Sequence, residues 1–358
     1  MRAAFLVVPF LLLASTGAAQ QPERFQLQGD DVAVYNLVGA VSVEAGTGNV
    51  TVDLTRTGRD AAKLKVEQGE LRDEETLRVI YPDGNLVAPS LGAGSSTTLR
   101  VREDGTFGDD DWDGGDRHHR PRDDYGRRVD IRGSGSGLEA GADLRIRVPA
   151  GRRLAVYLAV GKVSVTNVDG ELRVDAHNAP VTASGVKGEL TVDVGSGIVR
   201  VTDGQGLLNV DTGSGSVEVS RFKGRDLTVD TGSGNVNGTE LTAERLTVET
   251  GSGDIELAAV SAPSLSLETG SGTVRADLRT EVQSLSVETG SGDVAVTAPP
   301  TLDAEVEIET SSGDIESDFP LQVTRHARDH LVGRIGSGRG RIAVETGSGD
   351  VRLIKRPG

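Results

Sequence analysis

A phrase of about twelve residues that recurs along the chain constrains the fold more than any other feature. It reads LTVETGSGDIEL at 246–257, LSLETGSGTVRA at 265–276, LSVETGSGDVAV at 285–296 and IAVETGSGDVRL at 342–353. The glycines that open each Gly-Ser-Gly are Gly195, Gly213, Gly232, Gly251, Gly270 and Gly290, at steps of 18, 19, 19, 19 and 20 residues. Ser311 continues the series 21 residues later, and Gly347 follows after 36, which predicts two steps with one degenerate copy between them. A nearly constant period of this size indicates a repeat architecture.

Apolar and polar residues alternate on both sides of each glycine turn. In the copy at 246–257, Leu246, Val248, Ile255 and Leu257 alternate with polar or charged residues. A period of two predicts half-buried strands, and apolar residues at i, i+3 and i+4, which a helix needs, are missing.

Two arrangements of such strands compete. Neighbouring strands could pair across the turn as a row of hairpins, or each strand could pair with its equivalent one repeat away as a solenoid. The near-constant period favours the solenoid, because stacked coils need similar perimeters. A second turn at a fixed offset also favours it, in the stretches 168–170, 186–188 and 222–224, each an apolar residue followed by a polar residue and glycine. We therefore predict an all-β fold, a single-stranded parallel β-helix with coils of ~18–20 residues, whose narrow core fits the 3% aromatic content.

The phrase itself has a structural interpretation and a functional alternative. Glycine is expected at positions of positive φ in the corner. Ser and Thr hydroxyls are expected to form ladders between coils, and the aspartates at 254, 293, 314 and 350 suit the exit of a turn. The alternative is Ca²⁺ bound between coils, because Glu249, Glu268, Glu288 and Glu309 would stack as like charges. The nine-residue period of calcium-binding β-rolls is absent, so the structural interpretation is favoured.

The N-terminus predicts export. Residues 1–20 read MRAAFLVVPFLLLASTGAAQ, a basic start, a short apolar run and small residues before Gln20. This pattern is that of a secretory signal peptide at 1–19, with cleavage expected near Ala19. The chain has no Cys, which excludes disulfides and lipid attachment through an N-terminal cysteine. No later stretch is apolar enough to cross a membrane, so we expect an exported protein, periplasmic or extracellular at the cell surface.

The rest divides into two regions. Residues 20–144 are expected to form an irregular β-rich N-terminal region that caps the solenoid, and residues 145–358 the β-helix repeat domain. Within the first region, 103–131 is predicted to be a disordered acidic insert, because charge and glycine dominate it. Asp109, Asp111 and Asp113 there match the first half of an EF-hand loop, but the twelfth position is Arg120. These aspartates are the candidate metal ligands, although a solvated loop is the simpler interpretation.

No catalytic or cofactor-binding residue is predicted. The carboxylates occur once per coil and so belong to the repeat, while Phe222 and Phe319 are the only aromatic residues after position 157. His177 replaces a turn glycine and has no evident partner. His326 and His330 are four residues apart but lack a third ligand in evidence, so we expect these two histidines to lie in a surface loop. The final VRLIKRPG is expected to be an edge strand of the last coil, protected by its basic residues and proline.

The order of features resembles a known bacterial family. The matching residues are VPAG at 148–151 leading into GKVSV at 161–165, the repeated TGSGDV/I turns, and the ending FPLQV…LVGRIGSGRGRIAVETGSGDVRL. Over residues 145–354 the chain resembles the "putative adhesin" family of exported β-helical proteins. The resemblance implies a right-handed β-helix outside the cytoplasm, without catalytic residues.

Charge narrows the choice of partner. The net charge of −16 argues against nucleic acid, which needs clustered Lys and Arg. We expect a non-enzymatic exported cell-envelope protein, an adhesin or scaffold whose partner is a cell-envelope or extracellular macromolecule. The alternatives are a polysaccharide-active enzyme on the same fold, and a periplasmic accessory or sensor protein that binds a cation through the 109–119 loop.

Overall fold

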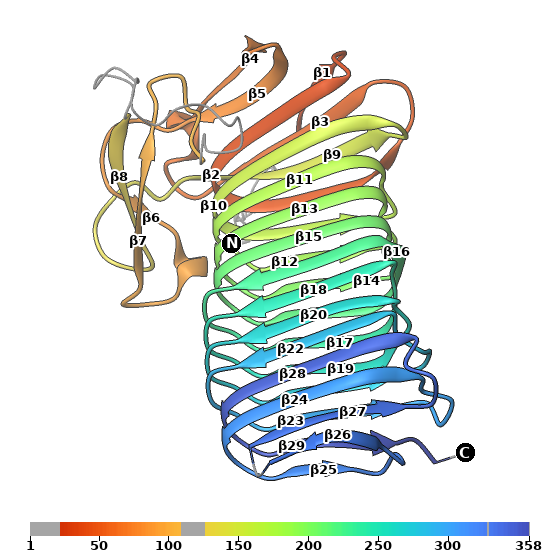
Figure 1. The fold of residues 1–358 in the computed structure, drawn as a ribbon. Helices are drawn as coiled ribbons and strands as arrows, with labels where there is room; N and C mark the ends of the chain where they lie inside the picture. The colour runs from red at the N-terminus through yellow and green to blue at the C-terminus, as the bar shows by residue number, and fades with distance from the viewer. Residues whose placement is uncertain (1–21, 109–125, 328, 358) are drawn as a thin grey trace, which may run out of the picture.

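The chain folds into a long stack of β-strands (Figure 1). The computed structural model describes residues 22–108, 126–327 and 329–357. Apart from two short 3₁₀ segments, η1 (Ala61–Lys63) and η2 (Pro89–Leu91), the described regular structure is β-strand. The predicted all-β class is confirmed.

Two faces of the stack run along the repeat region. The first face contains β11 (Asp169–Asn178), β13 (Lys187–Ser196), β15 (Gln205–Ser214), β18 (Arg245–Thr250), β20 (Ser264–Thr269), β22 (Ser284–Thr289), β28 (Gly340–Ser348) and β24 (Ala304–Ser312). The second face contains β12 (Val181–Ser184), β14 (Val199–Thr202), β17 (Val236–Thr242), β19 (Ile255–Val260), β21 (Val274–Leu278), β23 (Val294–Ala298), β29 (Val351–Lys355) and β25 (Ile315–Ser317). The long strands β10 (Arg152–Thr166) and β16 (Val217–Thr231) contribute to both faces.

Strands within each face pair in parallel with their equivalents one repeat away. Val181 lies opposite Val199, and Leu246 lies opposite Leu265, which in turn is followed by Leu285. This pairing is that of a solenoid and excludes the row of hairpins. The alternation in the sequence explains why the strands form, since every second side chain enters the core.

The core consists of columns of like residues. One column on the first face runs through Val32, Leu154, Leu172, Leu190, Leu208, Leu227, Leu246, Leu265, Leu285, Ile342 and Val306. All of these side chains are buried. Full burial of such a side chain is worth about 1.5–3 kcal/mol, so the columns supply the main stabilising term.

The N-terminal region continues the stack and then closes it. Its strands are β1 (Glu23–Leu27), β2 (Asp31–Gly46), β3 (Val50–Thr57), β4 (Lys65–Leu71), β5 (Glu74–Ile80) and β9 (Gly141–Pro149). Strand β2 pairs in parallel with β10, and its other edge pairs with β5 and β9. Antiparallel pairing of β9 with β3, and of β3 with β1, then covers the end of the rod.

A small sheet lies to one side of this end (Figure 1). It consists of β6 (Leu86–Val87), β7 (Ser96–Val101) and β8 (Arg127–Arg132). The predicted disordered insert at 103–131 is therefore too long at both ends, because β8 is a paired strand and Phe107 is buried. The Phe107 ring lies edge-on to Tyr35 and Tyr157, at centroid distances of 6.0 and 6.5 Å. Asp109, Asp111 and Asp113, like the predicted signal peptide at 1–19, lie outside the described residues.

The coils at the C-terminal end do not follow sequence order. Ile342 of β28 lies between Leu285 of β22 and Val306 of β24, and β29 lies between β23 and β25. The predicted simple succession of coils is thus wrong here, and so is the predicted edge strand at 351–358, because β29 is paired on both sides.

An antiparallel hairpin explains this order. It consists of β26 (Gln322–His326) and β27 (His330–Ile335), and β27 pairs with the outer edge of β24. With that edge occupied, the last coil in the sequence can pair with β24 only at its inner edge, between β22 and β24. Figure 1 shows the resulting order β22, β28, β24 along the rod.

Candidate functional site

The threonine and aspartate of the repeated phrase bond one coil to the next. Thr269 Oγ1 donates to the carbonyl oxygen of Gly253 at 2.9 Å, and Asp254 Oδ1 accepts from the Thr273 amide at 2.8 Å. The same threonine bond forms at Thr231, Thr250, Thr289, Thr310 and Thr346. The predicted hydroxyl ladders are confirmed for threonine.

The corner glycines allow two backbones to approach closely. A Cβ on Gly253 would lie 2.1 Å from the carbonyl oxygen of Gly234, and one on Gly251 would lie 2.5 Å from that of Gly232. Neither Gly251 nor Gly253 has a positive φ. The equivalents of Gly253 at Gly197, Gly292 and Gly349 do have positive φ, at 151°, 157° and 159°. The prediction of positive φ therefore holds in only some copies, and the close contact between coils is what the corner glycines share. Most of the phrase is therefore a packing device.

An acidic residue precedes the last buried side chain before each corner, which is Ala176, Val194 or, in later copies, the threonine. This acidic residue points outward and takes no part in the packing. Successive copies lie opposite one another in the parallel register and form what we call the acidic row: Asp175, Asp193, Asp211, Asp230, Glu249, Glu268, Glu288, Glu345 and Glu309. Neighbouring strands are about 4.8 Å apart. Like charges are thus lined up along most of the rod, which is unfavourable without compensation.

Two carboxylates of the row have a raised pKa to which a neighbouring acid contributes. The charges of Asp230 and Glu268 raise the pKa of Glu249. For Asp211, burial is the larger cause of a raised pKa, followed by the charge of Asp230. Within residues 22–108, 126–327 and 329–357, no ion pair is recorded for the row from Asp211 through Glu345.

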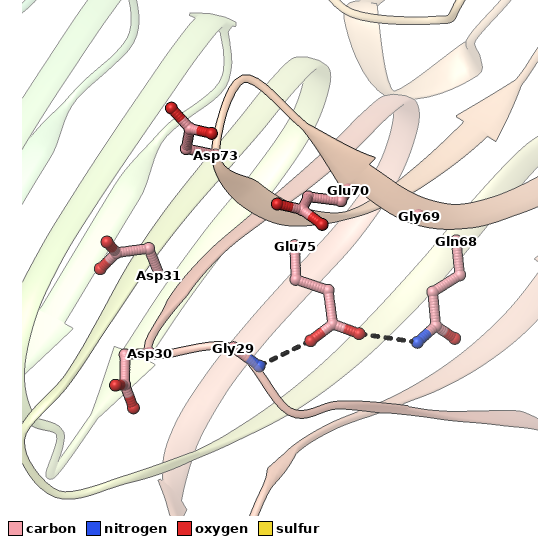
Figure 2. Close-up of a pocket in the computed structure, with 8 residues that line it drawn as sticks. All are labelled: Gly29, Asp30, Asp31, Gln68, Gly69, Glu70, Asp73 and Glu75. Carbon is pink, nitrogen blue, oxygen red and sulfur yellow. Dashed lines mark hydrogen bonds between the residues drawn. The ribbon is translucent and has the colours of Figure 1, made fainter.

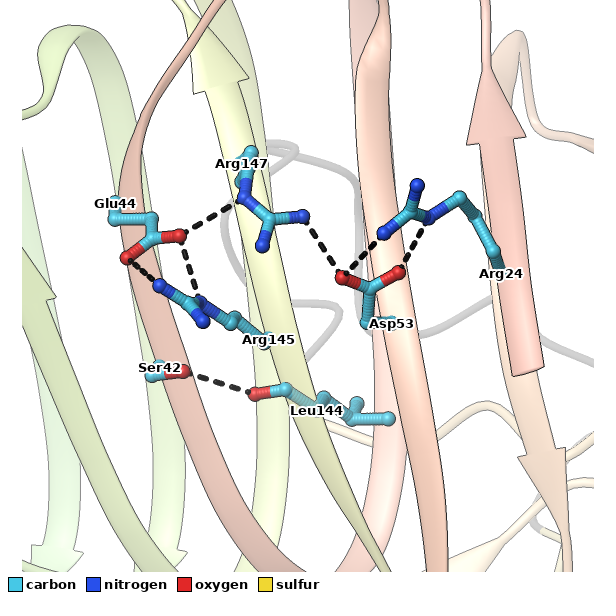
Figure 3. Close-up of polar contacts among 7 residues, drawn as sticks. All are labelled: Arg24, Ser42, Glu44, Asp53, Leu144, Arg145 and Arg147. Atoms are coloured by element: carbon cyan, nitrogen blue, oxygen red, sulfur yellow. Dashed lines mark hydrogen bonds and ion pairs between the residues drawn. The ribbon is translucent and has the colours of Figure 1, made fainter. Parts of the chain in front are cut away.

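In the N-terminal cap, by contrast, acidic side chains form ion pairs with arginines. In Figure 3, Arg147 lies between Glu44 and Asp53, Arg145 joins Glu44, and Arg24 joins Asp53 from the far side. Hydrogen bonds from Arg24 and Arg147 lower the pKa of Asp53 to about 2. Acid and base thus alternate across four strands of the cap, whereas the described residues give the acidic row no ion pair from Asp211 through Glu345.

A pocket lined by acidic residues lies at the same end, and two of its carboxylates have structural roles. Figure 2 shows it between the β1–β2 turn and the β4–β5 hairpin. Glu75 accepts hydrogen bonds from the Gly29 amide at 2.6 Å and from Gln68 Nε2 at 3.0 Å, and Asp31 pairs with Arg153. Glu75 thus holds the hairpin to the turn, and Asp31 joins the start of β2 to β10. The acidic row is therefore the stronger candidate for a functional surface.

The residues singled out in the sequence are spread over the rod. His177 is exposed at a corner, while Phe222 and Phe319 are buried in the core, where neither can stack on a sugar. His330 does not lie in a loop but begins β27, and its Nε2 lies 3.3 Å from Glu309 Oε1 and 3.8 Å from Glu307 Oε1. Sequence reasoning missed these two neighbours because they belong to another strand and look like ordinary repeat positions.

The repeat region matches a known protein family. A family model described as Toastrack DUF4097 matches residues 142–354. No functionally curated protein matches the chain. A solved structure described as a putative cell adhesion protein from Clostridium sporogenes ATCC 15579 aligns over 94% of this chain and 100% of its own, at 9% identity and a TM-score of 0.19.

No helix in the described part of the chain is both long and apolar enough to span a membrane.

Proposed function

The chain belongs to the Toastrack DUF4097 family, and from that premise we propose that it is a non-enzymatic protein of the cell envelope, an adhesin or scaffold that binds through the acidic row. The proposal includes export by the signal peptide at 1–19 and a division of the chain near residue 145. It also includes right-handed coils of ~18–20 residues, the hand that parallel strand connections favour.

One observation carries the proposal. The acidic row is a straight line of outward carboxylates at a regular spacing, set on a rigid sheet and without ion-pair partners over most of its described length. Repeat proteins use such extended faces to bind extended partners. The row is complementary to a partner with regularly spaced cationic groups, such as a basic polypeptide segment or an amine-bearing polymer at the cell surface.

The test is binding of a defined cationic polymer to the purified chain without residues 1–19. We expect poly-L-lysine to bind in a salt-dependent manner, and the triple variant Glu249→Gln, Glu268→Gln, Glu288→Gln to bind more weakly. The matched control, Glu70→Gln, Glu240→Gln, Glu256→Gln, removes the same charge from scattered exposed positions.

Equal weakening in both triple variants would mean that only net charge matters, and would overturn the row as the binding face. Turnover of a polysaccharide by the purified chain would contradict the non-enzymatic part of the proposal.

A further inference from the structure

The C-terminal end of the acidic row differs from the rest of it. Strand β24 presents Glu307 and Glu309 on one side, two residues apart, and β27 runs antiparallel along its outer edge. The register sets His330 directly opposite Glu309. An imidazole thus terminates the row, and it comes from a hairpin that is not part of the repeat.

Three potential ligand atoms converge here. One atom each from Glu307, Glu309 and His330 lie within 4.8 Å of one another. The Nε2 atom of His330 is shielded from solvent and has no hydrogen-bond partner among the described residues. A buried ring nitrogen that faces two carboxylates without a hydrogen bond calls for an explanation, because unsatisfied buried polar atoms are few in folded proteins.

Glu307 has a carboxylate oxygen that is available to bind a cation. Glu307 uses Oε2 to accept a hydrogen bond from Arg341 at 3.1 Å, and its other oxygen faces the imidazole. Glu345 lies beside Glu309 in the row and adds negative charge to the position. A cation between His330 and the two glutamates would relieve this charge and satisfy the ring nitrogen.

The donor set indicates which cation. Imidazole nitrogen with carboxylate oxygen suits Zn²⁺ and related first-row divalent ions, whereas Ca²⁺ and Mg²⁺ prefer oxygen ligands throughout. We propose that Glu307, Glu309 and His330 form a binding site for a divalent transition metal ion, which fastens the β26–β27 hairpin to the terminal coil. This proposal does not involve the aspartates at 109–113, and it goes beyond the proposed binding face.

Calorimetric titration with ZnCl₂ tests the proposal, on the chain without residues 1–19 and with His118 and His119 replaced by Gln. We expect one Zn²⁺ per chain, and affinity at least about tenfold weaker in His330→Gln and in Glu309→Gln, since even indirect supports of metal ligands are worth about 10–100-fold. The matched control, Glu268→Gln, removes a carboxylate of the row that lies three strands from Glu309, and it should leave Zn²⁺ affinity unchanged.

Unchanged Zn²⁺ affinity in His330→Gln, or an equal loss in Glu268→Gln, would overturn the site and leave an ordinary histidine–carboxylate contact. A second readout does not depend on how the variants fold. X-ray absorption of the Zn²⁺-loaded chain, still with Gln at 118 and 119, should show one imidazole among the ligands, and a spectrum with only oxygen ligands would contradict the proposal.

Discussion

Each position of the repeated phrase has its own physical task. Threonine and aspartate bond one coil to the next, and the glycines let backbones touch at distances that no Cβ permits. The outward acidic residue takes no part in these contacts between coils. The same short phrase therefore contains both the device that builds the rod and the residue that gives the rod its surface.

A methyl group at a corner glycine should destabilise the whole coil. In Gly253→Ala the new Cβ would meet the Gly234 carbonyl at 2.1 Å, so backbone must shift. We expect a loss of about 1–3 kcal/mol in the free energy of unfolding, the usual cost of overpacking. Gly69→Ala is the matched control, since a Cβ at position 69 would lie 3.9 Å from its nearest neighbour, an Arg78 side-chain nitrogen. Denaturant titration of both variants measures the difference, and equal stability would refute the packing role.

Titration of single carboxylates predicts how stability depends on pH. The raised pKa of Glu249 and of Asp211 means that protonation relieves the folded state. Stability should therefore rise as pH falls from neutral toward the ordinary pKa values of these groups, 4.5 for Glu249 and 3.8 for Asp211. The lowered pKa of Asp53, about 2 against an ordinary 3.8, acts in the opposite sense. Its contribution is present above 3.8 and is lost as pH falls toward 2.

The melting temperature should accordingly pass through a maximum at mildly acidic pH. Thermal melts between pH 3 and pH 8 provide the measurement. A melting temperature that only falls from pH 7 downward would show that the acidic row does not strain the fold.

At the scale of strands and coils, the sequence predicts the pairing well and the order poorly. The period and the alternation suffice for parallel stacking, because each copy carries the same apolar positions in the same phase. The copies at 285–296 and 342–353 are nearly interchangeable, so nothing local says which coil lies next to which. The order depends on the hairpin at 322–335, whose antiparallel pairing is not a repeat feature. For the same reason the neighbours of His330 could not be predicted.

Engineered disulfides distinguish the two possible orders. Ser286 lies opposite Ala343, and Ala343 lies opposite Glu307, so Ser286 and Glu307 are two strands apart. The pair Ser286→Cys with Ala343→Cys should form a disulfide in this chain, which has no other cysteine. The pair Ser286→Cys with Glu307→Cys should not, because two interstrand steps give about 9.6 Å, beyond the reach of a disulfide. Mass spectrometry of the oxidised variants detects which pair forms a disulfide. A disulfide in the second pair but not in the first would show that the coils stack in sequence order.

At the scale of the whole molecule, charge is distributed unevenly. The net charge is −16, yet the cap pairs its acids with arginines while the rod leaves a line of acids exposed. The sequence shows the net charge and the once-per-coil acids. Their straight alignment follows only from the register, and the compensation in the cap follows only from contacts between distant strands such as β1, β3 and β9.

The repeats build a stacked rod whose outward acids form one strained row, without a described ion pair from Asp211 through Glu345. The most direct measurement is the melting temperature against NaCl concentration for the unaltered chain and for Glu249→Gln, Glu268→Gln, Glu288→Gln. The account predicts that salt stabilises the unaltered chain by screening the row, and that the variant melts higher at low salt with a weaker salt dependence. A variant that melts lower, or that responds to salt as the unaltered chain does, would contradict the claim.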